Sequence, residues 1–190
     1  WVFGYCTSLE TVTVPEGITT LGKHTFRGCY KLETINLPST LTSIGNAAFY
    51  NCRALKNINI PTGVTNIGNY LFYNCYSLET ITLPNAKRIG SYAFQNCSKL
   101  ATISIPKTLT TVGQYAFNGC NALSTVNYAG TQANKKNISI GTYNARFKNA
   151  TWNCAEPIAV KITSQPTSVT VANGKTATVT VGAVGDGLTY

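Results

Sequence analysis

Short runs of alternating apolar and polar residues recur along the chain at a nearly constant interval. Each run starts with Thr or Asn, alternates with Val, Ile or Leu, and ends in proline; the five runs span 11–15, 34–38, 57–61, 80–84 and 102–106. Alternation with a period of two and many β-branched residues predicts a half-buried strand. The proline ends each strand because it lacks the N–H group that a strand ladder needs.

A second, shorter run follows each strand and ends in glycine; these runs span 18–22, 41–45, 64–68, 86–90 and 109–113. We interpret it as a second extended segment, with the glycine at a corner that needs either a positive φ or a close approach of two backbones. A Phe-x-x-Cys phrase comes next, as in Phe72 to Cys75. Apolar residues three positions apart predict one turn of α- or 3₁₀-helix.

The cysteines of this phrase give the period of the repeat. They stand at positions 6, 29, 52, 75, 97 and 120, so the spacings are 23, 23, 23, 22 and 23 residues. The residue missing from the unit that ends at Cys97 falls in the loop after Pro84. A fixed period predicts a solenoid, in which units that cannot bury an apolar face alone stack and bury it together. The predicted fold is a repeat solenoid of units of about 23 residues, with short parallel strands and one helical turn per unit.

The repeated phrase ends near Tyr128, and two different segments follow. We interpret residues 121–155 as a cap that covers the last apolar rung, which completes a solenoid domain over 1–155. Residues 156–190 form a short all-β segment in this interpretation. Asn173-Gly174 lies between two alternating runs there and predicts a hairpin.

Charge and hydropathy narrow the range of partners. The net charge of +9 comes from 15 basic and 6 acidic residues, but the basic residues are scattered and form no run, so we expect no nucleic-acid ligand. No segment approaches the roughly 18 apolar residues that a membrane-spanning helix needs. We therefore expect membrane attachment only through an anchor outside this sequence.

The seven cysteines are expected to be free. Their odd number and regular spacing argue against a disulfide framework. Cysteines on neighbouring rungs would direct their Cβ vectors almost in parallel, which fits disulfide geometry badly. We predict a ladder of buried thiols, with Cys154 in the cap. No C-x-x-C motif or histidine cluster is present, so neither a metal nor another cofactor is expected.

Catalysis is not expected, because the residues that support it are few. His24 is the single histidine, and it occupies a repeat position that later holds alanine or tyrosine. Any Ser–His or Cys–His system would depend on it alone. Glu10 and Glu33 share one repeat position and would be neighbours, but they lie too close for an inverting glycosidase pair and stand at a strand entrance. We interpret them as a solvated edge.

Two surfaces are candidates for ligand binding. Tyr70, Tyr92 and Tyr115 share one repeat position, and an exposed row of tyrosines can contact a protein or stack on sugars. The alternative is that each ring packs on its neighbour between rungs. Outward-facing Thr and Asn residues of the strands form the second surface, because solenoids often bind along such sheets. The alternative here is solvation, with Thr–Thr pairs supporting the sheet. The candidate residues of the second surface are Thr34, Asn36, Asn57, Asn59, Thr80 and Thr82.

The repeat resembles a known family. Over about residues 1–125, the phrase Leu-x-x-Ile-x-Ile-Pro-x-x-Val-Thr-x-Ile-Gly-x-x-Ala-Phe-x-x-Cys resembles the BspA-like leucine-rich repeats of bacterial surface proteins. Residues 156–190 resemble the first strands of a bacterial immunoglobulin-like domain. The resemblance implies an extracellular location on the bacterial surface and a non-catalytic module that adheres to a host or matrix protein. The alternative is a carbohydrate-binding or spacer module of a larger exported cell-wall protein or enzyme, because a fold does not fix a function.

Overall fold

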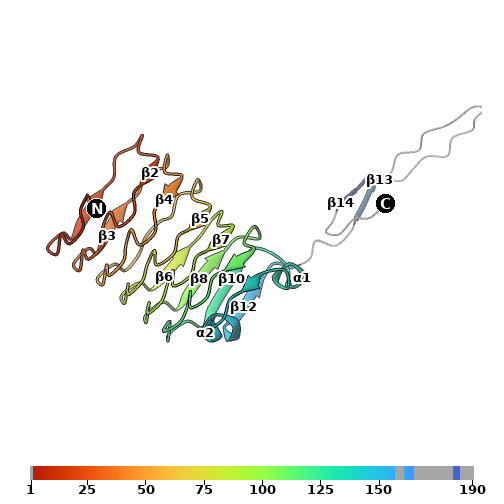
Figure 1. The fold of residues 1–190 in the computed structure, drawn as a ribbon. Helices are drawn as coiled ribbons and strands as arrows, with labels where there is room; N and C mark the ends of the chain where they lie inside the picture. The colour runs from red at the N-terminus through yellow and green to blue at the C-terminus, as the bar shows by residue number, and fades with distance from the viewer. Residues whose placement is uncertain (1, 157–160, 165–181, 185–190) are drawn as a thin grey trace, which may run out of the picture. The chain divides into compact units, whose positions relative to one another are not determined.

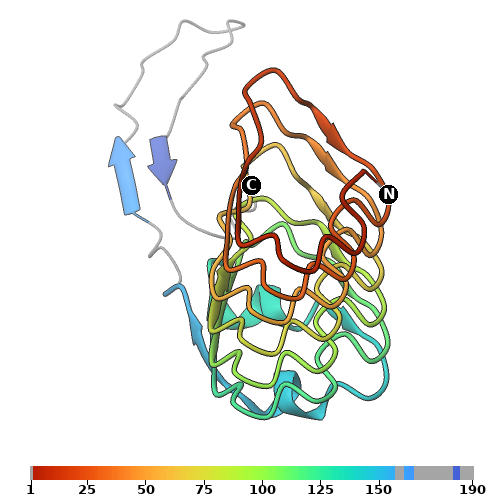
Figure 2. The same cartoon turned by 90° about the vertical axis from the view of Figure 1, so that its left-hand side faces the viewer.

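A computed structural model describes residues 2–156, 161–164 and 182–184. The chain divides into two units, residues 1–155 and 156–190, and each is described by itself. In the first unit the repeats lie side by side as successive rungs of a solenoid (Figure 1). Viewed from the N-terminal end, the rungs superpose on one another (Figure 2). The predicted solenoid with short parallel strands is confirmed.

Except in the third rung, the first strands of successive rungs pair in parallel. β1 (Thr11–Thr13) pairs with β3 (Thr34–Asn36), and a four-stranded sheet has the order β12-β10-β8-β6. Its strands are β6 (Thr80–Thr82), β8 (Thr102–Ile105), β10 (Thr125–Tyr128) and β12 (Thr151–Cys154). Thr80 lies beside Thr102 and Ile81 beside Ile103, so equivalent residues form columns.

The third rung departs from the predicted strand. Only one bridge, between Asn59 and Thr82, joins its 57–60 run to the next rung. Both outward positions of this run are asparagine, Asn57 and Asn59, and asparagine is unfavourable in strands. The apolar side chains of the run are nevertheless buried, as Ile58 and Ile60 show. The rung therefore keeps its place in the stack with a weaker ladder.

Six two-residue strands form the second extended segment. They are β2 (Thr20–Leu21), β4 (Ser43–Ile44), β5 (Asn66–Ile67), β7 (Arg88–Ile89), β9 (Thr111–Val112) and β11 (Ser139–Ile140). From β4 onward, the glycine after each of these strands is explained by close approach and not by a positive φ. A Cβ on Gly113 would lie 2.4 Å from the backbone nitrogen of Ser91, and one on Gly45 would lie 2.5 Å from that of Lys23.

The helical turn predicted for the Phe-x-x-Cys phrase is wrong. The segment is a series of turns in which Cys75 N–H donates to the Phe72 carbonyl at 3.2 Å. Phe72 N–H, however, donates to the Ala93 carbonyl of the next rung at 2.7 Å. Tyr70 also has a φ of 57°, which a right-handed helix does not allow. Hydrogen bonds between rungs thus replace those within a helix. The same left-handed position is held by His24, Ala47, Tyr92 and Tyr115 in the other rungs.

The core contains a phenylalanine ladder and a cysteine ladder. Phe72 stacks on Phe49 at a centroid distance of 5.4 Å and on Phe94 at 5.2 Å. The thiol of Cys75 donates to the Phe49 carbonyl at 3.2 Å, and the other ladder thiols make the same bond one rung apart. All seven cysteines are free. The predicted ladder of buried thiols is confirmed from Cys29 to Cys120, but it was wrong for Cys6, which is exposed in the first rung. Burial raises the pKa of Cys29 to about 11, and it raises the pKa of Cys75 further.

This arrangement predicts which thiols react. At neutral pH the folded chain is expected to react rapidly with a thiol reagent at Cys6, the exposed cysteine, and slowly at the half-buried Cys154. The five ladder thiols should react only after unfolding, because all of them are buried and a reagent cannot reach them in the folded chain. Counting labelled cysteines by mass spectrometry with and without denaturant checks this. Rapid labelling of a ladder cysteine in the folded chain would contradict it.

Residues 129–155 cover the last rung. The short helix α1 (Gln132–Lys135) begins at the capping residue Thr131. A second short helix, α2 (Ala145–Asn149), places Phe147 on Phe117 at 4.4 Å, which ends the phenylalanine ladder. Trp152 packs its edge against Phe147 at 5.0 Å. The apolar ladders therefore end against aromatic side chains of this segment.

Two strands are described in the second unit. β13 (Lys161–Ser164) and β14 (Gly182–Val184) pair antiparallel. The hairpin predicted at Asn173-Gly174 lies outside the described residues, as does most of the segment that resembles an immunoglobulin-like domain. A search of the described residues finds no helix with the length and apolar character to cross a membrane.

Candidate ligand-binding surfaces

The predicted strand residues come together on one face of the solenoid. Thr34, Asn36, Asn57, Asn59, Thr80 and Thr82 are all exposed, because their neighbours in the strands point into the core. Register extends this surface through Thr102 and Thr125 to Thr151 in one column. The second column continues from Thr82 through Ser104 and Asn127 to Asn153. We call these two columns the strand face.

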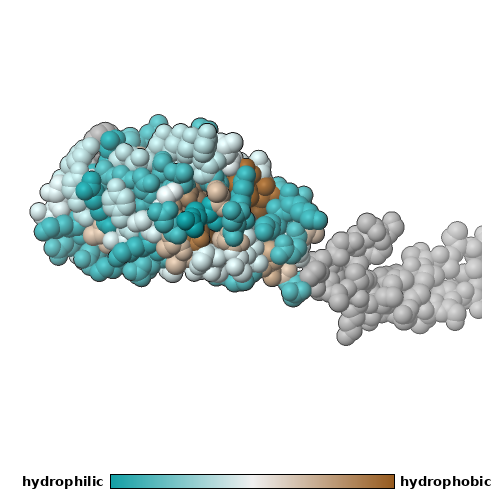
Figure 3. Space-filling view, turned by 90° about the horizontal axis from the view of Figure 1, so that it is seen from below, coloured by the Kyte–Doolittle hydropathy of each residue, from teal (hydrophilic) through white to brown (hydrophobic). Residues whose placement is uncertain are grey.

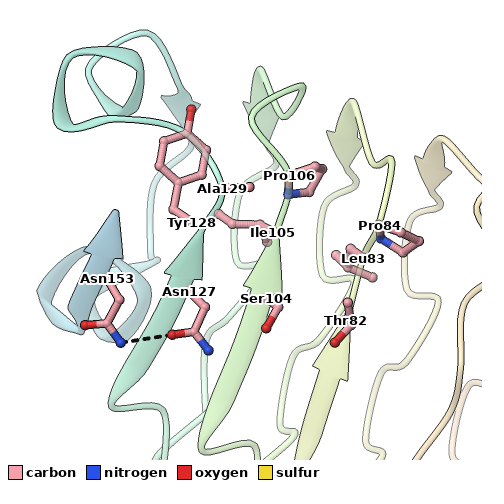
Figure 4. Close-up of a pocket in the computed structure, with 10 residues that line it drawn as sticks. All are labelled: Thr82, Leu83, Pro84, Ser104, Ile105, Pro106, Asn127, Tyr128, Ala129 and Asn153. Atoms are coloured by element: carbon pink, nitrogen blue, oxygen red, sulfur yellow. Dashed lines mark hydrogen bonds between the residues drawn. The ribbon is translucent and has the colours of Figure 1, made fainter. Parts of the chain in front are cut away.

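The strand face is uncharged and partly linked by hydrogen bonds. Asn153 Nδ2 donates to Asn127 Oδ1 at 2.9 Å, and Asn36 Nδ2 donates to Thr13 Oγ1 at 3.4 Å. Figure 4 shows the side chains of Thr82, Ser104, Asn127 and Asn153 on successive strands. The face therefore offers hydroxyl and amide groups at the regular spacing of paired strands.

A groove lies along the carboxyl edge of the strand face, and sequence reasoning missed it. Two hollows of about 320 and 430 Å³ adjoin, because Thr82 and Pro84 line both. Prolines and core residues such as Leu83 form the apolar part, and strand-face residues form the polar part (Figure 4). The proline that ends each alternating run could have indicated this groove from the sequence. The first hollow is lined by Thr82, Leu83, Pro84, Ser104, Ile105, Pro106, Asn127, Tyr128, Ala129 and Asn153, and the second by Glu16, Leu37, Ser39, Asn59, Ile60, Pro61, Thr62, Thr82 and Pro84.

The predicted tyrosines form a stacked column in the turn segment of the rung. Tyr70 lies 4.7 Å from Tyr92, Tyr92 lies 5.0 Å from Tyr115, and their planes differ by 1° and 5°. The structure adds Tyr143, which stacks on Tyr115 at 4.1 Å. Sequence reasoning missed Tyr143 because it lies in the cap, where the repeated phrase has ended. We call these four residues the tyrosine column.

Stacking decides what the tyrosine column offers to a ligand. Tyr92 and Tyr115 are half-buried because neighbouring rings cover both of their faces, whereas Tyr143 is 60% exposed. A sugar stacks on a free ring face. The inner rings present only their edges and hydroxyl groups, which disfavours glycan stacking along the column.

Other aromatic residues of the turns also stack. Tyr50 lies 4.7 Å from Tyr73, in a column next to Tyr70. The Arg53 guanidinium lies 4.7 Å from the Tyr30 ring centre and 5.9 Å from that of Tyr76. Arg53 therefore occupies in its rung the position that tyrosine holds in the rungs on either side. The Arg53 contacts place a cation against aromatic rings, which stabilises the turns.

Of the residues considered for catalysis, Glu10 and Glu33 lie on neighbouring rungs, where the Glu33 N–H donates to the Glu10 carbonyl at 2.9 Å. Glu33 forms an ion pair with Lys56 at 3.0 Å, and both side chains are more than half exposed. His24 lies in the turn segment, where burial and then the charge of Arg27 lower its pKa. Among the residues that the structure describes, no group of three His, Cys, Asp or Glu side chains is placed to hold a metal ion.

Hydrophilic and neutral residues dominate the side of the solenoid that Figure 3 shows, with hydrophobic residues gathered toward the middle and C-terminal rungs.

In-register parallel strands, apolar ladders and an outward polar face together define the class of leucine-rich repeat solenoids. Within that class, the family model described as "BspA type Leucine rich repeat region" matches six copies over residues 1–124 and 65–163. The chain belongs to this family.

Solved structures of bacterial leucine-rich repeat proteins are similar to this chain. A leucine-rich cell surface protein of Faecalibacterium prausnitzii is 32% identical over 68% of the chain, with a TM-score of 0.66. A leucine-rich repeat protein of T. pallidum is 29% identical over 80% of the chain and 75% of its own length, also with a TM-score of 0.66. A Bacteroides ovatus leucine-rich repeat protein, 23% identical over 80% of this chain and 51% of that one (TM-score 0.54), shares the fold.

The chain spans about a third, 34%, of the F. prausnitzii protein. No curated protein matches the sequence. The comparisons therefore place the chain in a family that includes cell-surface proteins, for which a binding or scaffold role is typical.

Proposed function

We propose that this chain is an extracellular, non-catalytic module of a bacterial cell-surface protein that binds a host or matrix protein through its strand face. The observation that carries the proposal is the groove beside the uncharged polar columns. It continues over several rungs because its two hollows share Thr82 and Pro84. Apolar side chains in such a groove would supply buried area, and the strand face would supply hydrogen bonds.

The cell-surface location is supported by the resemblance to the F. prausnitzii protein, whose name describes it as a cell surface protein. Among the predicted residues, Thr80, Thr82 and Asn59 lie on or next to the groove. Tyr70, Tyr92 and Tyr115 lie in the turn segment instead. We therefore assign the main contact to the strand face and an accessory role to the tyrosine edges.

Arrays of extracellular-matrix proteins and glycans test the proposal. The Ser104→Arg variant places a long charged side chain in the groove, whereas Ser43→Arg makes the same change at an exposed position of β4. We expect the chain to bind a matrix protein, Ser104→Arg to weaken this binding at least tenfold, or about 1.4 kcal/mol, and Ser43→Arg to leave it unchanged.

Two results would overturn the proposal. Glycan binding that survives Ser104→Arg would support the carbohydrate-binding alternative, for which the exposed ring of Tyr143 is the available stacking face. Silence on both arrays would support a spacer role. Circular dichroism of each variant confirms that the strands are retained.

A further inference from the structure

Six tyrosines form one continuous contact network along the turns. Tyr50 stacks on Tyr73, and Tyr73 lies 5.8 Å from Tyr70 with a 56° angle between the rings. From Tyr70 the tyrosine column continues through Tyr92 and Tyr115 to Tyr143. These six residues are more than half of the 11 tyrosines in the chain.

The fold does not itself require tyrosine in the column. All four column residues have φ between 55° and 61°, a region that favours glycine or asparagine over a bulky side chain. Ala47 takes the same position in an earlier rung with a φ of 56° and is buried there. A ring is therefore not needed to build the turn, and the phenols call for another explanation.

The closest pair in the network is also the best placed to react. The ring centres of Tyr115 and Tyr143 are 4.1 Å apart with planes 10° from parallel. A hydrogen bond between their hydroxyl groups raises the pKa of Tyr115. Tyr143 is 60% exposed, so a solution oxidant can reach this end of the column.

We propose that the tyrosine column is a site of oxidative cross-linking, in which Tyr115 and Tyr143 join as dityrosine. The oxidant is a haem peroxidase that uses hydrogen peroxide. It removes one electron and the phenolic proton from each tyrosine, and the two radicals form a carbon–carbon bond between ring positions ortho to the oxygens. Each ring then moves its ortho hydrogen to its oxygen as it becomes aromatic again. Two electrons and two protons reduce one hydrogen peroxide to two waters.

Sulfur-containing side chains compete little for the oxidant. The chain contains no methionine. The ladder cysteines are buried, and burial raises the pKa of Cys75, which keeps it as a thiol that oxidises less readily than a thiolate. Cys6 is exposed and Cys154 is half-buried, and a Cys6→Ser background removes the more reactive of the two. The cross-link would tie the loop before α2 to the preceding rung, and so would fix the cap covalently.

The test treats the full chain carrying Cys6→Ser with a haem peroxidase and hydrogen peroxide. We expect dityrosine fluorescence in the monomer, a mass lower by two hydrogens, and a cross-linked peptide that contains Tyr115 and Tyr143. Tyr143→Phe keeps a ring for stacking but removes the phenol, so it should lower the fluorescence by more than half. Tyr76→Phe is the matched control, because Tyr76 is exposed at 37% and lies outside the network.

Three outcomes would overturn the assignment: no dityrosine, cross-links only between chains, or a yield that Tyr143→Phe and Tyr76→Phe change equally. Circular dichroism and the thermal midpoint of Tyr143→Phe show whether the cap is still folded. The result is independent of the strand face, so it leaves the main contact of the proposed binding function untouched in either case.

Discussion

Replacement of Phe72 by alanine is expected to lower the free energy of unfolding by about 3–5 kcal/mol. Phe72 is fully buried, with rings of the phenylalanine ladder on both faces. Its backbone N–H and carbonyl are also fixed by bonds to Ala93 and Cys75. The neighbouring rungs therefore cannot collapse into the cavity, and most of the lost contact energy remains lost.

Denaturant unfolding followed by circular dichroism measures this effect, and hydrogen exchange of the backbone amides locates it. Each rung contacts mainly its neighbours, so protection should fall first in the rungs beside Phe72. Tyr76→Ala is the control, an aromatic truncation at an exposed turn position, with an expected change of about 0.5 kcal/mol. A loss below about 1 kcal/mol for Phe72→Ala would contradict the ladder as the source of stability.

The strands and the thiol ladder were predictable because the same pattern of residues recurs in several units. In any one unit, a five-residue alternating run is weak evidence for a strand. Five such runs at one period require parallel pairing, and the pairing places Thr34 and Thr80 on the same outward face. The same reasoning placed Cys75 in the core without a disulfide partner.

The turn segment was not predictable from local spacing. Phe72 and Cys75 are three residues apart, which fits both a helical turn and a β-turn with the bond between the Cys75 N–H and the Phe72 carbonyl. Hydrogen bonds to the next rung, whose residues lie some 20 positions away in the sequence, select the β-turn over the helical turn. The left-handed backbone of Tyr70 has the same origin, since nothing in a tyrosine favours it.

The candidate surfaces were predicted in part. The outward positions of the strand face follow from the alternation of apolar and polar residues. Only the register between strands had to be added to align these positions in columns. The groove depends on the path of the chain after Pro84 and Pro106, which alternation does not specify. The tyrosine column followed from the repeat as far as Tyr115, but the rung that holds Tyr143 lacks the repeated phrase.

The glycines after the second strands give the other large expected effect. A Cβ on Gly113 would lie 2.4 Å from the backbone nitrogen of Ser91 and 2.7 Å from the carbonyl carbon of Gly90. Both atoms belong to the backbone of the preceding rung, so no side chain can move aside. We expect Gly113→Ala to force the rungs apart and to lower the free energy of unfolding by about 3 kcal/mol, at the upper end for overpacked sites.

Gly22 provides a control at the same repeat position. A Cβ there would meet only Thr25 Oγ1 at 3.7 Å, an ordinary contact, because no described rung lies against that side. Gly22→Ala should change the free energy of unfolding by less than about 0.5 kcal/mol. Parallel denaturant titrations compare the two variants. Equal effects would mean that the glycines act through backbone freedom in the unfolded chain, whereas a large difference would show that the distance between rungs sets the requirement for glycine.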